Sequence, residues 1–161
     1  MKHWRRGFTL IEMVVVLAIV AILATAAQPL FELTLRRTQE AALRAALREL
    51  RNAIDEHRAA VLQRRVAPGA DGSPYPASLL SLVQGVPVLN EQGQPSPTQR
   101  LYLLRRLPRD PFAEPSLPAH LSWGQRASTS PPDSPQPGDD VFDVYSRSVL
   151  GALDGSRYAD W

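Results

Sequence analysis

Glu12 is a carboxylate inside a long apolar run, where side-chain packing gives it no obvious role. Residues 8–27 are twenty consecutive positions whose only polar members are Thr9, Glu12 and Thr25. Placing a carboxylate in hydrocarbon costs roughly 3 kcal/mol on insertion scales, and such residues generally mark function. A nearby positive charge would neutralise it, and buried charge is best attested as a device that sets the register between chains. Glu12 is therefore the first candidate functional residue.

The other groups that commonly carry catalysis are scattered through the chain. His3, His57 and His120 stand in unrelated sequence contexts, and there is no cysteine. The sequence contains no Gly-rich phosphate loop, no HExxH motif and no GxSxG motif. We therefore expect a protein that is not an enzyme. The lack of cysteine also excludes a disulfide and thiol chemistry.

Residues 8–27 have the length and composition of a membrane-spanning helix. Twenty residues at about 1.5 Å each extend about 30 Å, which is the thickness of the hydrocarbon core of a bilayer. Lys2, Arg5 and Arg6 precede the run. Because positively charged flanks stay in the cytoplasm, we expect a single span with a cytoplasmic N-terminus and everything after Gln28 on the other side.

Two cleaved-signal interpretations compete with a retained span. Residues 24–26, Ala-Thr-Ala, match the small-x-small site of a secretory signal peptide, and Arg5-Arg6 matches part of a twin-arginine signal. The apolar region of a secretory signal is usually about 7–15 residues long and uncharged. The run in this chain is longer and contains Glu12. A segment that is removed has no reason to contain a costly carboxylate, so we favour retention.

Residues 5–12, Arg-Arg-Gly-Phe-Thr-Leu-Ile-Glu, resemble the prepilin signal of type IV pilins and type II secretion pseudopilins. The resemblance implies that a prepilin peptidase cuts after Gly7 and methylates the new N-terminal residue, Phe8. Glu12 then falls at the fifth position of the processed chain, as it does in that family. In a staggered stack of helices, Glu12 of one subunit would pair with the Phe8 ammonium of its neighbour. The alternative is a glutamate that only snorkels or is protonated.

An amphipathic helix is predicted after the apolar run. Pro29 removes one backbone donor, so we expect it to interrupt and kink the helix. Apolar residues then recur every three or four positions up to about Val66, namely Leu43, Leu47, Leu50, Ile54 and Val61. His57 fills the missing position of this stripe, and we expect it to be packed with a hydrogen-bond partner. The breakers in residues 67–72 should end the helix.

Charge is unevenly distributed behind the formal net charge of +2. Residues 36–65 hold eight arginines and four acids, whereas residues 110–161 hold eight acids and three arginines. This asymmetry suggests attraction between subunits, head to stalk, although solvated charged faces are the commoner interpretation of such a pattern. The arginines fall on several helix faces and the head is acidic, so we expect no binding of nucleic acid.

The C-terminal region is rich in proline and is expected to combine short elements with loops. Residues 76–85 predict a short helix that stops at a glycine, and residues 90–98 predict a polar loop. Residues 98–107 predict a short helix or an extended segment.

Two short strands are predicted further along. Residues 119–123 and 141–145 should form an antiparallel hairpin, joined by the Ser/Pro/Asp-rich loop of residues 126–140. The expected fold class is α+β and pilin-like, with a long N-terminal helix, its first half transmembrane, packed on a small C-terminal head with a short antiparallel sheet. The expected divisions are a leader (1–7), a transmembrane and polymerisation segment (8–28), an amphipathic stalk helix (29–66) and a globular head (67–161).

Two stretches of the head resemble the major pseudopilin, the G-type subunit, of type II secretion systems. One is Leu-Pro-Arg-Asp-Pro-Phe at residues 107–112, where two prolines fix the backbone on both sides of Asp110. The other is the ending at residues 141–161, where a strand with Tyr-Ser precedes a loop that closes near an Asp and a Trp.

In that family the final loop holds a calcium ion. The resemblance implies Asp154 and Asp160 as ligands, with Ser146 or loop carbonyls completing the shell. The chain departs from the pattern, because Leu150 and Leu153 stand in the loop and the usual run of neighbouring acids is missing. Calcium takes about six to eight oxygen ligands. The alternative is a loop that packing closes without any ion.

The resemblance implies a structural subunit of a type II secretion pseudopilus, a periplasmic filament that drives protein export. The implied partners are further copies of the chain, other pseudopilins, the prepilin peptidase and the inner-membrane assembly platform. The implied location is the bacterial inner membrane, with one span and a periplasmic head. Two alternatives stay open: a minor pilin of a type IV pilus, and a DNA-binding pilin-like subunit. The lack of cysteine argues against the pilus, where a C-terminal disulfide loop is common.

Overall fold

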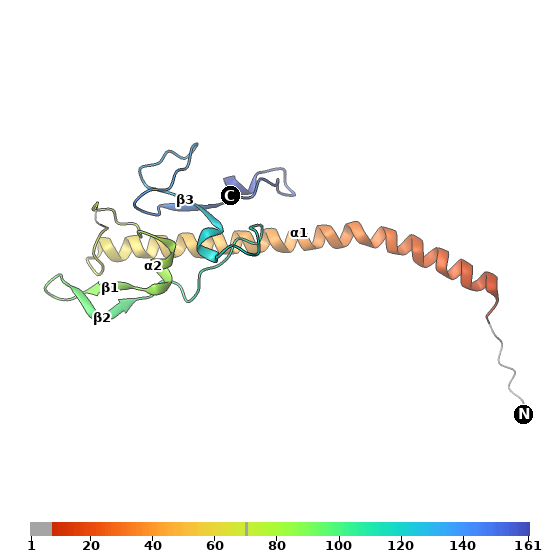
Figure 1. The fold of residues 1–161 in the computed structure, drawn as a ribbon, viewed down its shortest axis with the longest axis horizontal. Helices are drawn as coiled ribbons and strands as arrows, with labels where there is room; N and C mark the ends of the chain where they lie inside the picture. The colour runs from red at the N-terminus through yellow and green to blue at the C-terminus, as the bar shows by residue number, and fades with distance from the viewer. Residues whose placement is uncertain (1–7, 70) are drawn as a thin grey trace, which may run out of the picture. The chain divides into compact units, whose positions relative to one another are not determined.

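The computed structural model describes residues 8–69 and 71–161 (Figure 1). The elements are helices α1 (Leu10–Leu62) and α2 (Leu79–Gln84), strands β1 (Val86–Leu89), β2 (Pro95–Leu101), β3 (Trp123–Arg126) and β4 (Asp143–Ser146), and 3-10 helices η1 (Ala119–Leu121) and η2 (Tyr158–Asp160). A long N-terminal helix followed by small antiparallel sheets confirms the predicted α+β, pilin-like fold class. The chain divides into a first unit, Met1–Thr38, and a second unit, Gln39–Trp161, which are described separately.

In the first unit, α1 continues through Pro29 without a break. The predicted interruption of the helix at this position is therefore wrong. Proline removes only one backbone donor, and the turns on either side keep their own hydrogen bonds. Side chains add to them, since Thr25 Oγ1 donates to the Ile22 carbonyl oxygen at 2.8 Å and Thr34 Oγ1 donates to the Leu30 carbonyl oxygen at 2.9 Å. A kink at Pro29 stays a prediction.

In the second unit, α1 ends at Leu62, earlier than the predicted end at Val66. Arg64 has a positive φ of 57°, which turns the chain out of the helix. Val66 then forms an antiparallel bridge with Val88 of β1. The helix end is closed locally, because the Arg64 N–H donates to the Val61 carbonyl oxygen at 2.9 Å and the Arg65 N–H donates to the Ala60 carbonyl oxygen at 2.8 Å, as in a Schellman motif.

The strand pair β1 and β2 was not foreseen in this form. The two strands are antiparallel, with Val86 opposite Leu101. The turn between them is built by Asn90, whose side-chain oxygen accepts hydrogen bonds from two backbone N–H groups at 3.0 and 2.9 Å. Part of the predicted polar loop 90–98 therefore belongs to β2. Of the two alternatives for residues 98–107, the structure has an extended segment at its start and no helix.

The short helix predicted within residues 76–85 is confirmed as α2. Ser78 caps it, because its side chain accepts from the Ser81 N–H. The helix ends at Gly85, whose φ of 78° suits glycine.

The predicted antiparallel hairpin is present with shifted boundaries. β3 pairs with β4, and Trp123 lies opposite Ser146. Residues 119–121, predicted as strand, form η1 instead. The reason is local, since Ser122 Oγ donates to the Ala119 carbonyl oxygen at 2.7 Å and closes the turn.

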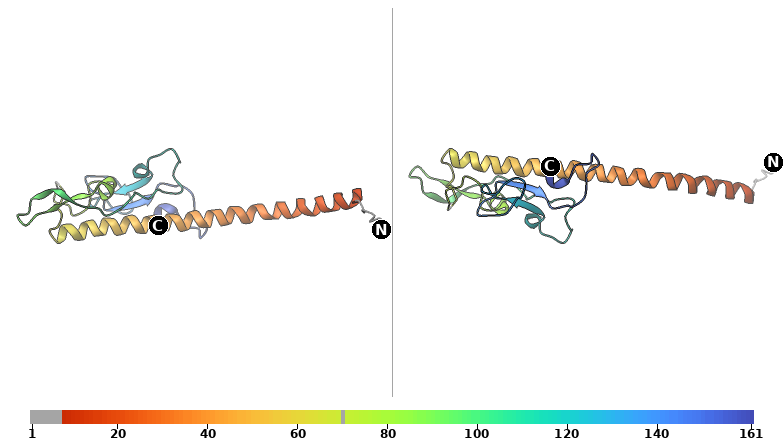
Figure 2. Two further views of the ribbon diagram at one scale, coloured as in Figure 1. Left: turned by 90° about the horizontal axis from the view of Figure 1, so that it is seen from below. Right: turned by 90° about the horizontal axis from the view of Figure 1, so that it is seen from above.

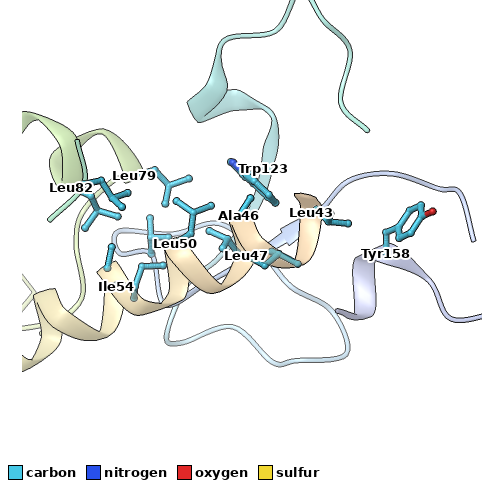
Figure 3. Close-up of a cluster of buried hydrophobic side chains, with 13 residues drawn as sticks. Leu43, Ala46, Leu47, Leu50, Ile54, Leu79, Leu82, Trp123 and Tyr158 are labelled. Carbon is cyan, nitrogen blue, oxygen red and sulfur yellow. The ribbon is translucent and has the colours of Figure 1, made fainter. Parts of the chain in front are cut away.

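The core of the second unit lies along one side of α1, and the elements after α1 cover that side (Figure 2). Figure 3 shows the predicted stripe packed against α2 and Trp123. Full burial of a leucine contributes about 2 kcal/mol, so this stripe is the main attachment of the helix to the rest of the unit. Its buried members are Leu43, Leu47, Leu50 and Ile54. Val61 packs instead on a smaller cluster with Ala60 and Val66.

Candidate functional site

The start of α1 is organised by Thr9 and Glu12. Thr9 Oγ1 accepts a hydrogen bond from the Glu12 N–H at 3.3 Å, and the Thr9 N–H donates to the Glu12 carboxylate at 3.5 Å. This reciprocal arrangement is a capping box, which satisfies N–H groups that a helix start leaves without partners. The helix dipole also favours a carboxylate at this end. Sequence reasoning missed this role, although the Thr-x-x-Glu spacing is its signature.

The apolar residues after Glu12 have no cover within the described part of the chain. Between Phe8 and Leu35, every residue whose side chain is described is exposed, on all faces of the helix. Among the described residues, α1 is the one helix long and apolar enough to cross a membrane. A helix that is apolar on all sides requires lipid or other apolar chains around it. This indicates a single-pass membrane anchor.

The carboxylate of Glu12 forms no ion pair with any described residue. Its contact with the Thr9 N–H is long for an N–H···O bond, which is usually about 2.9–3.0 Å, and is therefore weak. A charged donor would compete for it effectively. Phe8, which would carry the ammonium group after processing, is described and exposed. Gly7 and the rest of the predicted leader lie outside the described residues.

Two arginines of α1 in the second unit bind acids from the acidic end of the chain. Arg44 Nη2 lies 3.3 Å from an Asp154 carboxylate oxygen, and Arg51 Nε lies 2.9 Å from an Asp143 carboxylate oxygen. Arg51 also donates to the Trp161 carbonyl oxygen at 2.6 Å. At these side chains, the positive charge of α1 and the negative charge of the acidic end are therefore paired within one chain.

The two head stretches singled out in the sequence meet at a buried hydrogen bond. Ser146 Oγ donates to the Asp110 carboxylate at 2.6 Å, and both side chains are buried. The other carboxylate oxygen of Asp110 accepts from the Phe112 N–H at 2.8 Å, which fixes the turn at the two prolines. The Asp110 N–H in turn donates to Ser122 Oγ at 3.2 Å. Asp110 therefore ties the loop of residues 107–112 to β4 and to the residue before β3.

Each of the predicted calcium ligands is bonded to a different protein group. One carboxylate oxygen of Asp154 accepts from the N–H and Oγ of Ser156, at 2.9 and 2.6 Å. The two carboxylate oxygens of Asp160 each accept one hydrogen bond from Arg157, from its Nε at 2.8 Å and from its Nη2 at 2.9 Å. Ser146 is occupied by the buried hydrogen bond described above.

The oxygen atoms that would bind calcium are thus each engaged in hydrogen bonds with other protein groups. The hydrogen bonds from Ser156 hold the pKa of Asp154 below its ordinary value, and the charge of Arg44 adds a smaller effect. Within residues 8–69 and 71–161, no three His, Cys, Asp or Glu side chains lie together as a metal site. The side chains as arranged do not fit a calcium ion, and calcium binding stays a prediction.

Glu40 is a buried carboxylate that the sequence did not single out. It is 8% exposed, and its Oε1 accepts from the Leu153 N–H at 2.8 Å and from the Tyr158 hydroxyl at 2.9 Å. Tyr158 is itself fully buried and stacks on Phe112, with ring centroids 4.2 Å apart. Its position in the sequence could have indicated burial, because Glu40 lies three residues before Leu43 and so on the same helix face as the apolar stripe.

A second buried carboxylate, Asp140, was also missed, and it fastens the long loop before β4. It accepts from the Ser128 N–H at 2.8 Å, from Ser128 Oγ at 2.6 Å and from Ser73 Oγ. Burial alone would raise the pKa of Asp140, but the hydrogen bonds from the two serines outweigh it and hold the pKa below its ordinary value.

His57 is packed with a hydrogen-bond partner, as predicted. It is 4% exposed, and its Nδ1 lies 3.0 Å from the Pro74 carbonyl oxygen. Burial lowers the pKa of His57, because the charged form loses hydration, and the bond to Pro74 opposes this only in part. The ring borders a small apolar cavity of about 180 Å³, and Tyr75 is the one other titratable side chain among the described residues that line it.

Comparison with known proteins identifies the N-terminal segment. Residues 5–28 match the family described as the prokaryotic N-terminal methylation motif, a type IV pilin-like prepilin signal. The match includes Gly7, Phe8 and Glu12, and it indicates a type IV pilin-like or pseudopilin-type protein. No significant match was found among curated proteins or among solved structures.

Proposed function

We propose that the chain is a structural subunit of a type II secretion pseudopilus, which polymerises through its N-terminal helix into a periplasmic filament that drives protein export. The observation that carries this proposal is the uncovered apolar start of α1, which contains the Thr9–Glu12 capping box and lies within the methylation motif. Such a helix needs an apolar environment that only a membrane or further copies of the chain supply. The role is structural and not enzymatic.

Processing creates the partner that Glu12 lacks. Cleavage after Gly7 by a prepilin peptidase gives Phe8 a methylated, positively charged amino group. In the membrane, the Glu12 carboxylate keeps its weak bond to the Thr9 N–H. In a stack of copies, the Phe8 ammonium of a neighbour displaces that N–H and pairs with Glu12. The pair forms only in one register, so the charge selects the assembled arrangement.

The flanking charge supports the proposed location. Lys2, Arg5 and Arg6 precede the span, and positive charge there favours a cytoplasmic N-terminus, one span of the bacterial inner membrane and a second unit in the periplasm. Other pseudopilins and the inner-membrane assembly platform are the partners of this state.

The choice of type II secretion over a type IV pilus rests on the second unit. The two stretches that resemble the major pseudopilin are joined by the Ser146–Asp110 hydrogen bond, so they act as one structural feature. The chain has no cysteine for a C-terminal disulfide loop. A minor pilin of a type IV pilus is the second candidate. Deletion of the gene separates the two, because loss of a pseudopilin stops export of secreted enzymes, whereas loss of a pilin stops surface pili.

A DNA-binding subunit is the third candidate, and it is disfavoured by charge. Arg44 and Arg51 are paired with Asp154 and Asp143, so their charges are partly neutralised on the helix. The mobility of DNA in a gel should be unchanged by the purified chain at low salt. A salt-sensitive shift would favour the DNA-binding alternative.

The central test separates the charge of Glu12 from its capping role. Glutamine also serves in a capping box, so Glu12→Gln keeps the helix start and removes only the charge. We expect Glu12→Gln to insert in the membrane normally and to lose filament formation. Thr9→Ala weakens the cap while the charge remains, and should assemble better than Glu12→Gln. Glu32→Gln, an exposed acid later in α1, is the matched control.

Two readouts decide the outcome. Mass spectrometry of the purified parent should find a chain that begins with N-methylated Phe8, and sheared fibres report assembly at equal expression. A chain that begins at Ala27 would contradict the processing step. Filaments of Glu12→Gln equal to those of the parent would contradict charge pairing.

A further inference from the structure

The end of the chain is attached to α1 by three charged side chains. Two arginines of α1 contact the C-terminal segment, residues 147–161. Arg44 forms an ion pair with Asp154 and a cation–π contact with Trp161. Arg51 donates a hydrogen bond to the Trp161 carbonyl oxygen. The Arg44 guanidinium carbon lies 4.0 Å from the centroid of the Trp161 ring, within the range of a cation–π contact. Glu40 binds the same segment from the preceding turn of the helix.

The segment is closed internally as well. Trp161 Nε1 donates to Ser156 Oγ at 2.6 Å, and Ser156 donates to Asp154. The Ala152 N–H donates to the Ser156 carbonyl oxygen at 2.7 Å, which closes the loop around Gly155. The loop is therefore closed by hydrogen bonds between its own residues, and the contacts with α1 attach the closed loop to the helix.

The polarity of these contacts is opposite to that of a calcium loop. A calcium loop directs oxygens towards a shared cation. This segment directs the Leu153 N–H and the Tyr158 O–H towards a carboxylate, Glu40. The cation beside Asp154 is the guanidinium of Arg44, which a metal ion would have to displace.

We propose that residues 147–161 form a latch that closes on α1 without a metal ion, with Glu40 as the buried anchor and Arg44 and Arg51 as the cations. The latch fulfils by protein groups the role that calcium has in the pseudopilins whose ending the chain resembles. It holds in the full-length subunit whether or not the subunit assembles, so it does not rest on the proposed function.

Limited proteolysis of the full-length chain in detergent tests the latch. Arg147 and Arg157 are exposed trypsin sites at and within the segment, and their cleavage reports opening when normalised to cleavage after the exposed Arg64, just beyond α1. Cleavage of the parent, and its melting temperature, should be the same in millimolar calcium and in chelator. Glu40→Ala leaves two donors without their acceptor and should speed cleavage roughly tenfold. Calcium should not restore protection.

Variants at other exposed positions of the same helix provide the controls. Arg44→Met removes a half-exposed ion pair and a cation–π contact, and should speed cleavage roughly threefold. Glu49→Ala and Arg48→Met change exposed residues of the same types and should leave cleavage unchanged. If Glu40→Ala does not fold, Arg44→Met decides, because its side chain is half exposed.

Two results would overturn the latch. One is a parent whose melting temperature rises with calcium, by mass action, and loses the rise in the double variant Asp154→Asn with Asp160→Asn. The other is a Glu40→Ala chain that folds and is cleaved no faster than Glu49→Ala.

Discussion

The Asp110–Ser146 contact gives the most quantitative prediction for the second unit. The proposed change is Asp110→Ala. It removes the acceptor of the Ser146 hydroxyl at 2.6 Å and of the Phe112 N–H at 2.8 Å. Asp110 is 1% exposed and Ser146 is 0% exposed, so water does not easily replace the lost acceptor.

The expected cost follows from these two bonds. A hydrogen bond to a charged group contributes about 1.5–3 kcal/mol, and a buried donor without a partner adds to the loss. Allowing for partial relaxation, Asp110→Ala should lower the free energy of unfolding by about 3 kcal/mol. For a unit of this size that is a fall in melting temperature of about 12 °C. Ser146→Ala removes the bond to Asp110 and a longer one, in which Ser146 Oγ accepts from the Ser148 N–H at 3.2 Å, and should cost about 2 kcal/mol.

A double-mutant cycle measured by thermal or denaturant unfolding checks the assignment. The double variant should cost about 1 kcal/mol less than the sum of the single variants, because both remove the same bond. Asp133→Ala, on the exposed part of the loop before β4, is the control and should stay within about 0.5 kcal/mol of the parent. Additive single costs, or an Asp110→Ala chain as stable as Asp133→Ala, would refute the reasoning.

Two further predictions concern β3 and the helix histidine. A Cβ at Gly124 would lie 2.3 Å from the ring of Tyr145, so Gly124→Ala should destabilise the unit by about 1–3 kcal/mol in unfolding experiments, and Tyr145→Ala should relieve most of that cost. Because the pKa of His57 is lowered on folding, the unfolded chain binds the proton more tightly, and stability should be complete above about pH 6.5 and fall as the pH drops below it. His57→Leu should remove that part of the pH dependence, and an unchanged profile would contradict it.

The features that the sequence predicted are those set by local spacing. The stripe of Leu43, Leu47, Leu50 and Ile54 has a helical period, and the structure buries all four. The helix α2 has a serine cap and a glycine stop within a few residues of each other. His57 followed from its place in the stripe, and the prepilin signal from the spacing of residues 5–12.

The features that the sequence did not predict are set by partners far along the chain. Beyond the end of α1, Val66 forms a bridge with Val88, and β2 was obscured by two prolines in a polar stretch. Glu40 reaches Tyr158, 118 residues away. No periodicity connects such residues. The capping box of Thr9 and Glu12 is different, because it was readable from the sequence and was missed once Glu12 was interpreted only as an assembly residue.

The ion pairs within one chain bear on which interactions would drive assembly. Arg44 and Arg51 bind Asp154 and Asp143 of the same subunit, so these charges contribute little to attraction between copies. Exposed pairs are also weak and screened by salt. The N-terminal part of α1 differs, because its apolar surface is uncovered and the carboxylate at its start, Glu12, has only a weak N–H contact. In the proposed filament, the free energy of assembly should therefore come mainly from this helix, with Glu12 selecting the register, and filaments of the processed chain should tolerate high salt.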